Sequence, residues 1–412
     1  MKKSLLILTI TLISFTYSAQ VYDSVFLQSG YTNQSYYNLN SGEVANVDNE
    51  NWDIAFSLSA YGSSIRINGK TGTELYVYPN GDTSSWSSVD ISGIASWTKL
   101  YDSDTSWSLG AFDASANPVN PLDLGWGVYN TVTHHILGDS LHVIKLSNGD
   151  YKKLQVMKLA GGTYEFRYAN IDGSNEVNTS VSKSSFTNKN FGYYSIQNQL
   201  EIDREPDTDS WHLVFTKYVG QLSPGLFYGV TGVLSNKNIL VAQEEQVDVN
   251  TVSSPTNPYQ TEINTIGYDW KSYSGGGYVL ESDLCYFIKD ANDDIWKIFF
   301  TGFEGGSTGK IVFGKEALTS TNTSEIDAIT TFAVYPNPTT DNRITVLYDV
   351  NSISDNDNLF IYNLNGELLQ SHRLSQYGFN QKTLSLADFS KGVYLISLRV
   401  GNDIVTEKLI IQ

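Results

Sequence analysis

The feature that most restricts the fold of this chain is an internal repeat of short blocks with strand-like patterns. The first copy has Tyr36-Tyr37, an acidic turn and then residues 51–56, and the later copy has Tyr193-Tyr194, an acidic turn and then residues 210–215. Large apolar residues alternate in both copies, as Trp52, Ile54 and Phe56 and as Trp211, Leu213 and Phe215. This alternation predicts strands that turn one large apolar face inward.

A second pair of blocks follows the first pair in the same order. Trp126 precedes the apolar stretch 139–145 and the turn Asn148-Gly149-Asp150, and Trp270 precedes a matching stretch, 283–289. Asn-Gly between alternating runs is a strong hairpin signal. Because self-similarity indicates duplicated structural units, the sequence predicts two tandem β domains at residues 20–180 and 181–318.

Composition supports an all-β fold. Aromatic residues make up 13% of the chain, with 27 Tyr and 33 Gly, and aromatic residues favour strands whereas Gly favours turns. No long segment has helical periodicity. The formal net charge of −18 argues against nucleic acid and anionic membranes as partners, since both require a basic face.

The N-terminus has the pattern of a secretory signal peptide over residues 1–19. Lys2 and Lys3 precede the apolar run 5–13, and Tyr17-Ser18-Ala19 provides small residues for cleavage. The run is shorter than the roughly 20 residues of a membrane span, so we expect no transmembrane segment. Cys285 is the only cysteine, which excludes an intrachain disulfide, and its position excludes a lipoprotein anchor at the cleavage site.

Parts of the repeat resemble the HmuY family of secreted haem-binding proteins. The resemblance lies in residues 40–47, 51–56 and 64–72, and again in the hairpins 143–156 and 283–300. It implies an all-β, hand-like fold that grips haem.

Members of that family hold the haem iron between two side chains, His or Met. Met157 is the only Met outside the predicted signal peptide, so a Met–Met pair is excluded. The repeat region contains His134, His135, His142 and His212. His134 and His135 lie in the loop where the resemblance places a ligand and are the candidate haem ligands, although no clear second ligand emerges.

The C-terminal region has a different pattern. Residues 319–329 are rich in Ser and Thr and predict a linker. Short strands and turns then run from Tyr335-Pro336-Asn337-Pro338 to Lys408-Leu409-Ile410-Ile411, which predicts a small Ig-like β-sandwich. Residues 330–412 resemble the type A C-terminal sorting domain of type IX secretion cargo. The resemblance implies export through the periplasm by the type IX machinery, with the remaining protein attached to the outer surface or released.

Catalytic and metal-binding patterns are weak. The stretch 305–309 fits a nucleophile elbow, but its flanks predict strand–turn–strand rather than the required strand–turn–helix. The acidic stretch 290–294 resembles the start of a calcium loop, yet Ile295 replaces the expected Gly. We therefore predict no catalytic residues and no metal site.

The predicted function is a non-enzymatic secreted or surface binding protein for haem. The alternatives are a glycan- or peptide-binding or scaffold protein without haem, or a glycan hydrolase that uses paired carboxylates.

Overall fold

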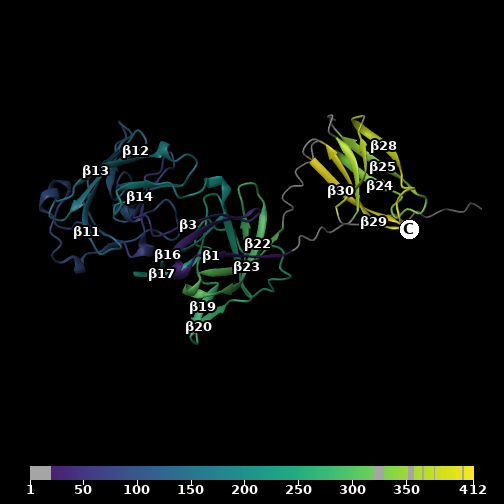
Figure 1. The fold of residues 1–412 in the computed structure, drawn as a ribbon. Coiled ribbons are helices and arrows are strands. Elements are labelled where there is room, and N and C mark those ends of the chain that lie inside the picture. Colours follow the sequence, from purple (N-terminus) through teal and green to yellow (C-terminus); the bar gives the residue numbers. More distant parts are fainter. Residues whose placement is uncertain (1–19, 319–328, 351–356, 364–365, 375, 401–402) are drawn as a thin grey trace, which may run out of the picture. The chain divides into compact units, whose positions relative to one another are not determined.

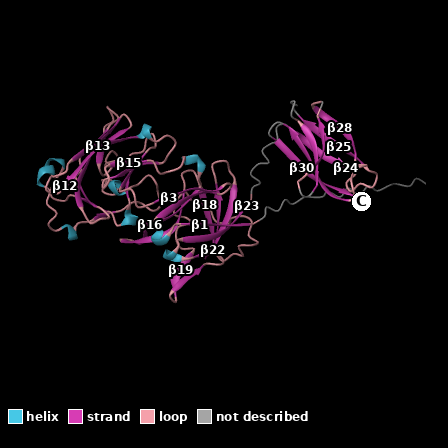
Figure 2. Cartoon of the chain, in the orientation of Figure 1, coloured by secondary structure: helices cyan, strands magenta, loops and turns pink. Residues whose placement is uncertain are grey.

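The computed structural model describes residues 20–318, 329–350, 357–363, 366–374, 376–400 and 403–412 (Figure 1). The chain divides into two compact units, with the division between residues 319 and 320. Strands dominate both units, and the described helices are short 3-10 turns (Figure 2). This confirms the all-β prediction. The predicted signal peptide and residues 319–328 of the predicted linker lie outside the described residues.

The first unit contains two lobes, and each lobe has a larger sheet and a four-stranded sheet. In the first lobe the larger sheet has the order β13-β12-β11-β10-β6-β7, with β9 paired to β11 and β8 to β9, and the smaller sheet has the order β15-β14-β4-β5. The strands of the first lobe are β4 (Ile54–Ser57), β5 (Ile65–Ile67), β6 (Glu74–Val77), β7 (Lys99–Leu100), β8 (Gly127–Tyr129), β9 (Ile136–Gly138), β10 (His142–Lys145), β11 (Tyr151–Ala160), β12 (Thr163–Asn170), β13 (Val177–Ser182), β14 (Phe191–Ser195) and β15 (Leu200–Ile202).

In the second lobe the five-stranded sheet has the order β1-β23-β22-β21-β18, and the four-stranded sheet has the order β17-β16-β2-β3. A separate hairpin, β19-β20, belongs to the same lobe. The strands are β1 (Val21–Phe26), β2 (Asn33–Asn38), β3 (Gly42–Asp48), β16 (Leu213–Ser223), β17 (Leu226–Ser235), β18 (Leu240–Glu244), β19 (Lys271–Ser274), β20 (Gly277–Leu280), β21 (Cys285–Lys289), β22 (Ile295–Phe303) and β23 (Lys310–Ala317).

The 3-10 turns of the first unit connect these strands. They comprise Ser29–Tyr31, Gly69–Thr71, Thr83–Ser88, Ile94–Ser96, Ala111–Asp113, Lys183–Ser185, Thr208–Ser210 and Gly305–Ser307. Gly305–Ser307 joins β22 to β23, so the candidate elbow lies in the expected strand–turn–strand. Asp290 Oδ1 accepts the backbone N–H of Asn292 and of Asp294 in the β21–β22 turn, as in an ordinary hairpin connection.

The two copies of the repeat exchange strands. β1 and β2 of the early copy pair with β23 and β16 of the late copy, whereas β13 and β14 pair with β12 and β4 of the early copy. The registers correspond, because Tyr37 lies opposite Leu213 and Tyr194 lies opposite Ile54. The predicted domain boundary at residues 180 and 181 falls inside β13, so each lobe is assembled from both segments.

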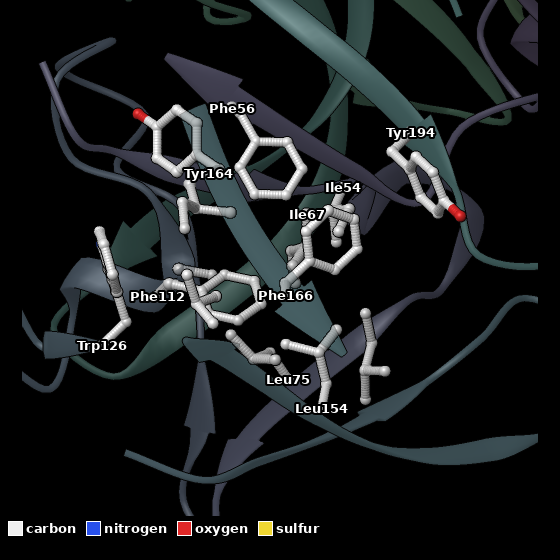
Figure 3. Close-up of a cluster of buried hydrophobic side chains, with 14 of the residues drawn as sticks. Ile54, Phe56, Ile67, Leu75, Phe112, Trp126, Leu154, Tyr164, Phe166 and Tyr194 are labelled. Carbon is white, nitrogen blue, oxygen red and sulfur yellow. The ribbon is translucent and has the colours of Figure 1, made fainter. Parts of the chain in front are cut away.

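Each lobe has its own hydrophobic core. Phe56, Phe166 and Tyr194 pack together in the first lobe (Figure 3), and Tyr194 comes from the exchanged strand β14. Tyr37, Phe215 and Phe313 occupy the equivalent core of the second lobe. The exchange therefore buries apolar side chains that would otherwise be left in water.

The second unit is a two-sheet sandwich with the orders β24-β25-β28 and β27-β26-β29-β30. Leu359, Ile361, Ile396 and Leu398 are among the side chains of its buried core. Its strands are β24 (Ile329–Tyr335), β25 (Arg343–Val350), β26 (Asn358–Asn363), β27 (Leu368–Arg373), β28 (Gly378–Ser385), β29 (Gly392–Val400) and β30 (Asp403–Ile411). The predicted C-terminal sandwich is confirmed.

Candidate ligand-binding site

A cavity of about 300 Å³ is lined by residues from the four-stranded sheets of both lobes. Ligand pockets in proteins begin at about this size. Its walls combine aromatic rings, amides and carboxyl groups: Tyr36, Trp52, Trp107, Phe191, Tyr193, Trp211, Gln34, Asn49, Asn68, Asn190, Asp102 and Glu205.

The Tyr-Tyr pairs of the repeat place one ring in a lobe core and the other ring at the cavity. Successive side chains of a strand point to opposite faces. Tyr37 and Tyr194 therefore enter the cores, whereas Tyr36 and Tyr193 line the cavity. Tyr36 and Tyr193 are 2% and 6% exposed. The duplicated dipeptide thus supplies matching rings from the two copies.

Trp52 and Trp211 also occupy equivalent positions. Each lies just before a strand, β4 or β16, rather than on its apolar face as the alternation predicted. Trp52 meets Tyr193 edge to face with centroids 5.0 Å apart, and Trp211 meets Tyr36 edge to face at 4.9 Å. This geometry is favourable for aromatic pairs. The prediction for the two tryptophans was wrong because the extended alternation begins only after them.

Two Asn side chains hold the equivalent turns in place. Asn68 Nδ2 donates to the backbone oxygens of Asn49 and Trp52, at 2.9 and 3.0 Å. Asn236 Nδ2 makes the matching bonds to Thr208 and Trp211, at 2.7 and 2.8 Å. Both tryptophans are thereby fixed against the cavity.

Trp107 joins the lobes at the cavity. Its indole Nε1 donates to the backbone oxygen of Ser235 at 2.8 Å, and the Arg66 guanidinium lies 5.2 Å from its ring. Arg66 also donates to the backbone oxygens of Ser103, Ser106 and Leu109. A charged side chain with these bonds is a rigid support for the ring.

Glu205 carries the most buried carboxyl group of the cavity wall, and its Oε2 accepts two hydrogen bonds. The residue is 3% exposed, and Oε2 accepts from the backbone N–H of Phe191 at 3.1 Å and from the Tyr193 hydroxyl at 3.2 Å. Among the described residues no ion pair to Glu205 is found within 4.0 Å. Burial therefore raises the pKa of Glu205 to about 7. Burial likewise raises the pKa of Tyr36, and the Glu205 carboxyl adds to the effect.

Arg204 is buried beside Glu205. Its Nη2 donates to the backbone oxygen of Asp48 at 2.7 Å, and its guanidinium lies 4.9 Å from the Tyr193 ring. Its Nε and Nη1 have no hydrogen-bond partner in the described part of the chain, and the same is true of Trp211 Nε1 and the Tyr218 hydroxyl. Buried polar groups without a partner are rare in proteins, and two of these residues, Trp211 and Tyr218, line the cavity.

A long hairpin, β16–β17, reaches from the second lobe to the first lobe at the cavity. The rings of Tyr101 and Phe227 stack with centroids 3.8 Å apart and planes within 8°. Gln221 N–H donates to Asp104 Oδ2 at 3.0 Å. Because Tyr101, Phe227 and Asp104 all line the cavity, this hairpin forms part of its enclosure.

The predicted haem ligands lie elsewhere. His134 and His135 are in the loop between β8 and β9, where His134 is exposed, and neither lines the cavity. His134 Nδ1 is 2.7 Å from the Tyr129 hydroxyl. The structure therefore does not bring His134 or His135 together with the aromatic walls.

The other candidate ligands are also separate from the cavity. His142 is fully buried in β10 with no partner for either ring nitrogen among the described residues. His212 Nδ1 accepts the Leu39 N–H at 3.2 Å, and Met157 lies in β11. Among the described residues no group of three or more His, Cys, Asp or Glu side chains could hold a metal ion.

The sequence analysis missed Glu205 and the role of the tyrosines. Arg204-Glu205 looked like part of an exposed acidic turn, because charged residues are rarely buried. The repeated Tyr-Tyr pairs were visible, but their division between core and cavity required the strand pairing.

Comparison with known proteins identifies the C-terminal unit. The family described as secretion system C-terminal sorting domain matches residues 333–412. This match shows a type IX secretion sorting domain, in agreement with the predicted span 330–412, and it indicates export by the type IX system to the cell surface or the extracellular medium. No curated protein matches the chain. No helix among the described residues has the length and apolar composition to cross a membrane.

Proposed function

We propose that the exported chain is a non-enzymatic binding protein that holds an uncharged glycan in the cavity between its lobes. The observation that carries the proposal is the cavity wall itself, which contains Trp52, Trp107 and Trp211 together with several amide side chains. Aromatic faces pack against the C–H faces of sugars, and amides can both donate to and accept from hydroxyl groups.

Among the described residues, three of the four cations that line the cavity already have partners, which favours an uncharged ligand. Lys70 is paired with Glu50, and Lys99 is paired with Glu74. Arg66 donates hydrogen bonds to backbone oxygens, and its Nε lies 3.8 Å from Asp102 Oδ2. A strongly charged ligand would therefore have to compete with existing partners for these groups.

A glycan array with the purified protein tests the proposal. We expect Trp52→Ala to weaken the glycan signal by about fivefold or more, because truncating an aromatic anchor of a binding site costs over about 1 kcal/mol. Trp97→Ala is the matched control, since Trp97 is also partly buried but does not line the cavity. An unaltered signal in Trp52→Ala, or an equal loss in the control, would contradict the proposal.

Haem is a second candidate, supported by one contact. If the His134 ring donates Nδ1–H to the Tyr129 hydroxyl, its Nε2 is free to bind a metal. Titration with haem should then give a Soret shift that is lost in a variant with both His134→Ala and His135→Ala. Absence of a shift in either oxidation state of the iron would remove haem from consideration.

A glycan hydrolase is the remaining alternative for the function of the cavity. A glycan hydrolase needs two carboxyl groups across the scissile bond, and Glu205 and Asp102 both line the cavity. Glu205 is buried and Asp102 is partly buried, and Asp102 accepts the backbone N–H of Ala111 at 2.8 Å and of Ile67 at 3.2 Å. These bonds support a structural role for Asp102 and a binding function for the cavity. The proposed route to the surface passes through the periplasm.

A further inference from the structure

We propose that Glu205 decides which ligand the cavity accepts, because its carboxyl group donates a hydrogen bond to an uncharged acceptor oxygen of the ligand. This inference rests on the proposed glycan-binding function and assigns one residue a role in it. The role differs from that of an ordinary acidic residue in a sugar site, which accepts hydrogen bonds from hydroxyl groups.

The surroundings of Glu205 favour a carboxyl group that carries its proton. Oε2 already accepts from the Phe191 N–H and the Tyr193 hydroxyl. No hydrogen bond to Oε1 is found in the described part of the chain, so Oε1 is the oxygen that can hold the proton and donate it. A buried carboxylate without an ion pair is costly and is avoided by protonation.

The charged and titratable groups that face Glu205 come from four segments. They are Tyr193 of β14, Tyr36 of β2, Lys237 after β17 and the adjacent Arg204. Arg204 and Lys237 both favour the ionised form, but neither lies within 4.0 Å as an ion pair. Burial also lowers the pKa of Lys237. Burial is the larger influence on Glu205, and its pKa rises to about 7.

The geometry of the wall places this donor among ring faces. Tyr193, which donates to Glu205, meets Trp52 edge to face, and all three residues line the cavity. A sugar ring stacked on these aromatics can present its ring oxygen or a glycosidic oxygen, which accepts but cannot donate a hydrogen bond, to the carboxyl group. Deprotonation would replace the donor with a negative charge that repels the same oxygen.

Calorimetric titration of the purified protein with maltose, cellobiose, lactose and N,N′-diacetylchitobiose tests the inference. For a sugar that binds at about pH 5.5, we expect affinity about thirtyfold weaker at about pH 8.5, because a group with a pKa of about 7 is then only about 3% protonated. Glu205→Gln keeps a donor at every pH, so its affinity should be the same at both pH values. Glu281→Gln, an exposed position outside the cavity wall, should behave like the unaltered protein.

The outcomes separate the two proposals. A sugar that binds equally well at both pH values, or that still loses affinity at high pH in Glu205→Gln, would overturn the role of Glu205 and leave glycan binding intact. If none of the four sugars and no array glycan binds to the folded protein, the proposed function fails, and the role of Glu205 fails with it.

Discussion

His142 is fully buried in the first lobe, and neither of its ring nitrogens has a hydrogen-bond partner in the part of the chain that the structure describes. It packs against Phe112, with ring centroids 4.8 Å apart, and burial lowers the pKa of His142 to about 3. In the unfolded chain the same group binds a proton near pH 6.5. Between these values the unfolded state holds the extra proton, so the stability contributed by neutral His142 is present above about pH 6.5 and is lost as the pH falls toward 3.

We therefore predict that His142→Leu stabilises the first unit at neutral pH and more strongly in acid. The gain should be about 1 kcal/mol at pH 7, because an unsatisfied buried polar group is removed. This gain in the free energy of unfolding should be about 2 kcal/mol larger at about pH 5, because the unfolded chain then binds a proton that buried His142 does not. Urea unfolding followed by tryptophan fluorescence measures it cleanly, since all eight Trp lie before residue 319.

His135→Leu is the control for this prediction, because His135 lies in the β8–β9 loop and not in the core. It should leave the acid dependence of unfolding unchanged. An equal loss of stability in acid for His142→Leu and the unaltered protein would show that His142 is not the group that takes up the proton.

At the residue level, alternation in the sequence predicted core positions well but cavity positions poorly. Ile54 and Phe56 face the first core and Leu213 and Phe215 face the second, as expected. Trp52 and Trp211 do not follow them, because they lie in the turns before the strands. The carboxyl group of Glu205 could not be found from sequence, since its burial depends on strands that are distant along the chain.

Among the elements, the β16–β17 hairpin has few contacts that hold its tip to the first lobe. Leu222 and Leu226 are 40% and 53% exposed, whereas the Phe227 ring stacks on Tyr101. Its Gln221 N–H donates to Asp104 Oδ2. Segments with few buried contacts open locally at low free-energy cost.

We predict that Phe227→Ala speeds hydrogen exchange at the tip of this hairpin by about fivefold or more, since an aromatic pair contributes about 1 kcal/mol beyond burial. Exchange in the core strand β22 should not change. Leu226→Ala, which alters an exposed neighbour outside the cavity wall, should have little effect. Uniform acceleration across the unit would indicate global destabilisation instead of local opening.

Hairpins were also the elements that the sequence predicted best. The Asn148-Gly149 turn joins β10 to β11, and Gly149 has φ of 93°, as a glycine turn requires. Strand exchange was not predictable by the same reasoning. Both copies carry the same strand patterns, so a strand buries an equivalent apolar face whether it pairs within its own copy or with the other copy. The sequence pattern therefore cannot distinguish the two pairings.

At the scale of the whole first unit, the exchange of strands between the two copies of the repeat determines which fragments can fold. Residues 20–180 contain β1 and β2 but lack their partners β23 and β16, and they also lack β14. Residues 49–204 have similar length and contain all strands of the first lobe, β4 to β15. We predict dispersed amide NMR spectra for 49–204 and poorly dispersed spectra for 20–180.

Mixing provides the complementary experiment for the exchange. Residues 20–180 and 181–318 together contain every strand of the unit, apart from a cut within β13, and should assemble into a heterodimer with native near-UV circular dichroism. Independent folding of 20–180 as a stable monomer would contradict the exchanged pairing.

The two units have separate tasks, and this leads to the last prediction. The core of the sandwich is built from residues of the matched region 333–412, such as Ile344 and Leu398, whereas the cores of the lobes are built from residues before 319. Deletion of 330–412 should therefore leave the first unit folded, with unchanged tryptophan fluorescence, and retain it in the periplasm. Fusion of residues 320–412 to an unrelated periplasmic protein should have the opposite effect and direct that protein to the surface. Normal surface delivery of the truncated chain would show that the sorting signal lies outside the sandwich. A truncated chain that is retained but unfolded would show that the sandwich also supports the fold of the first unit.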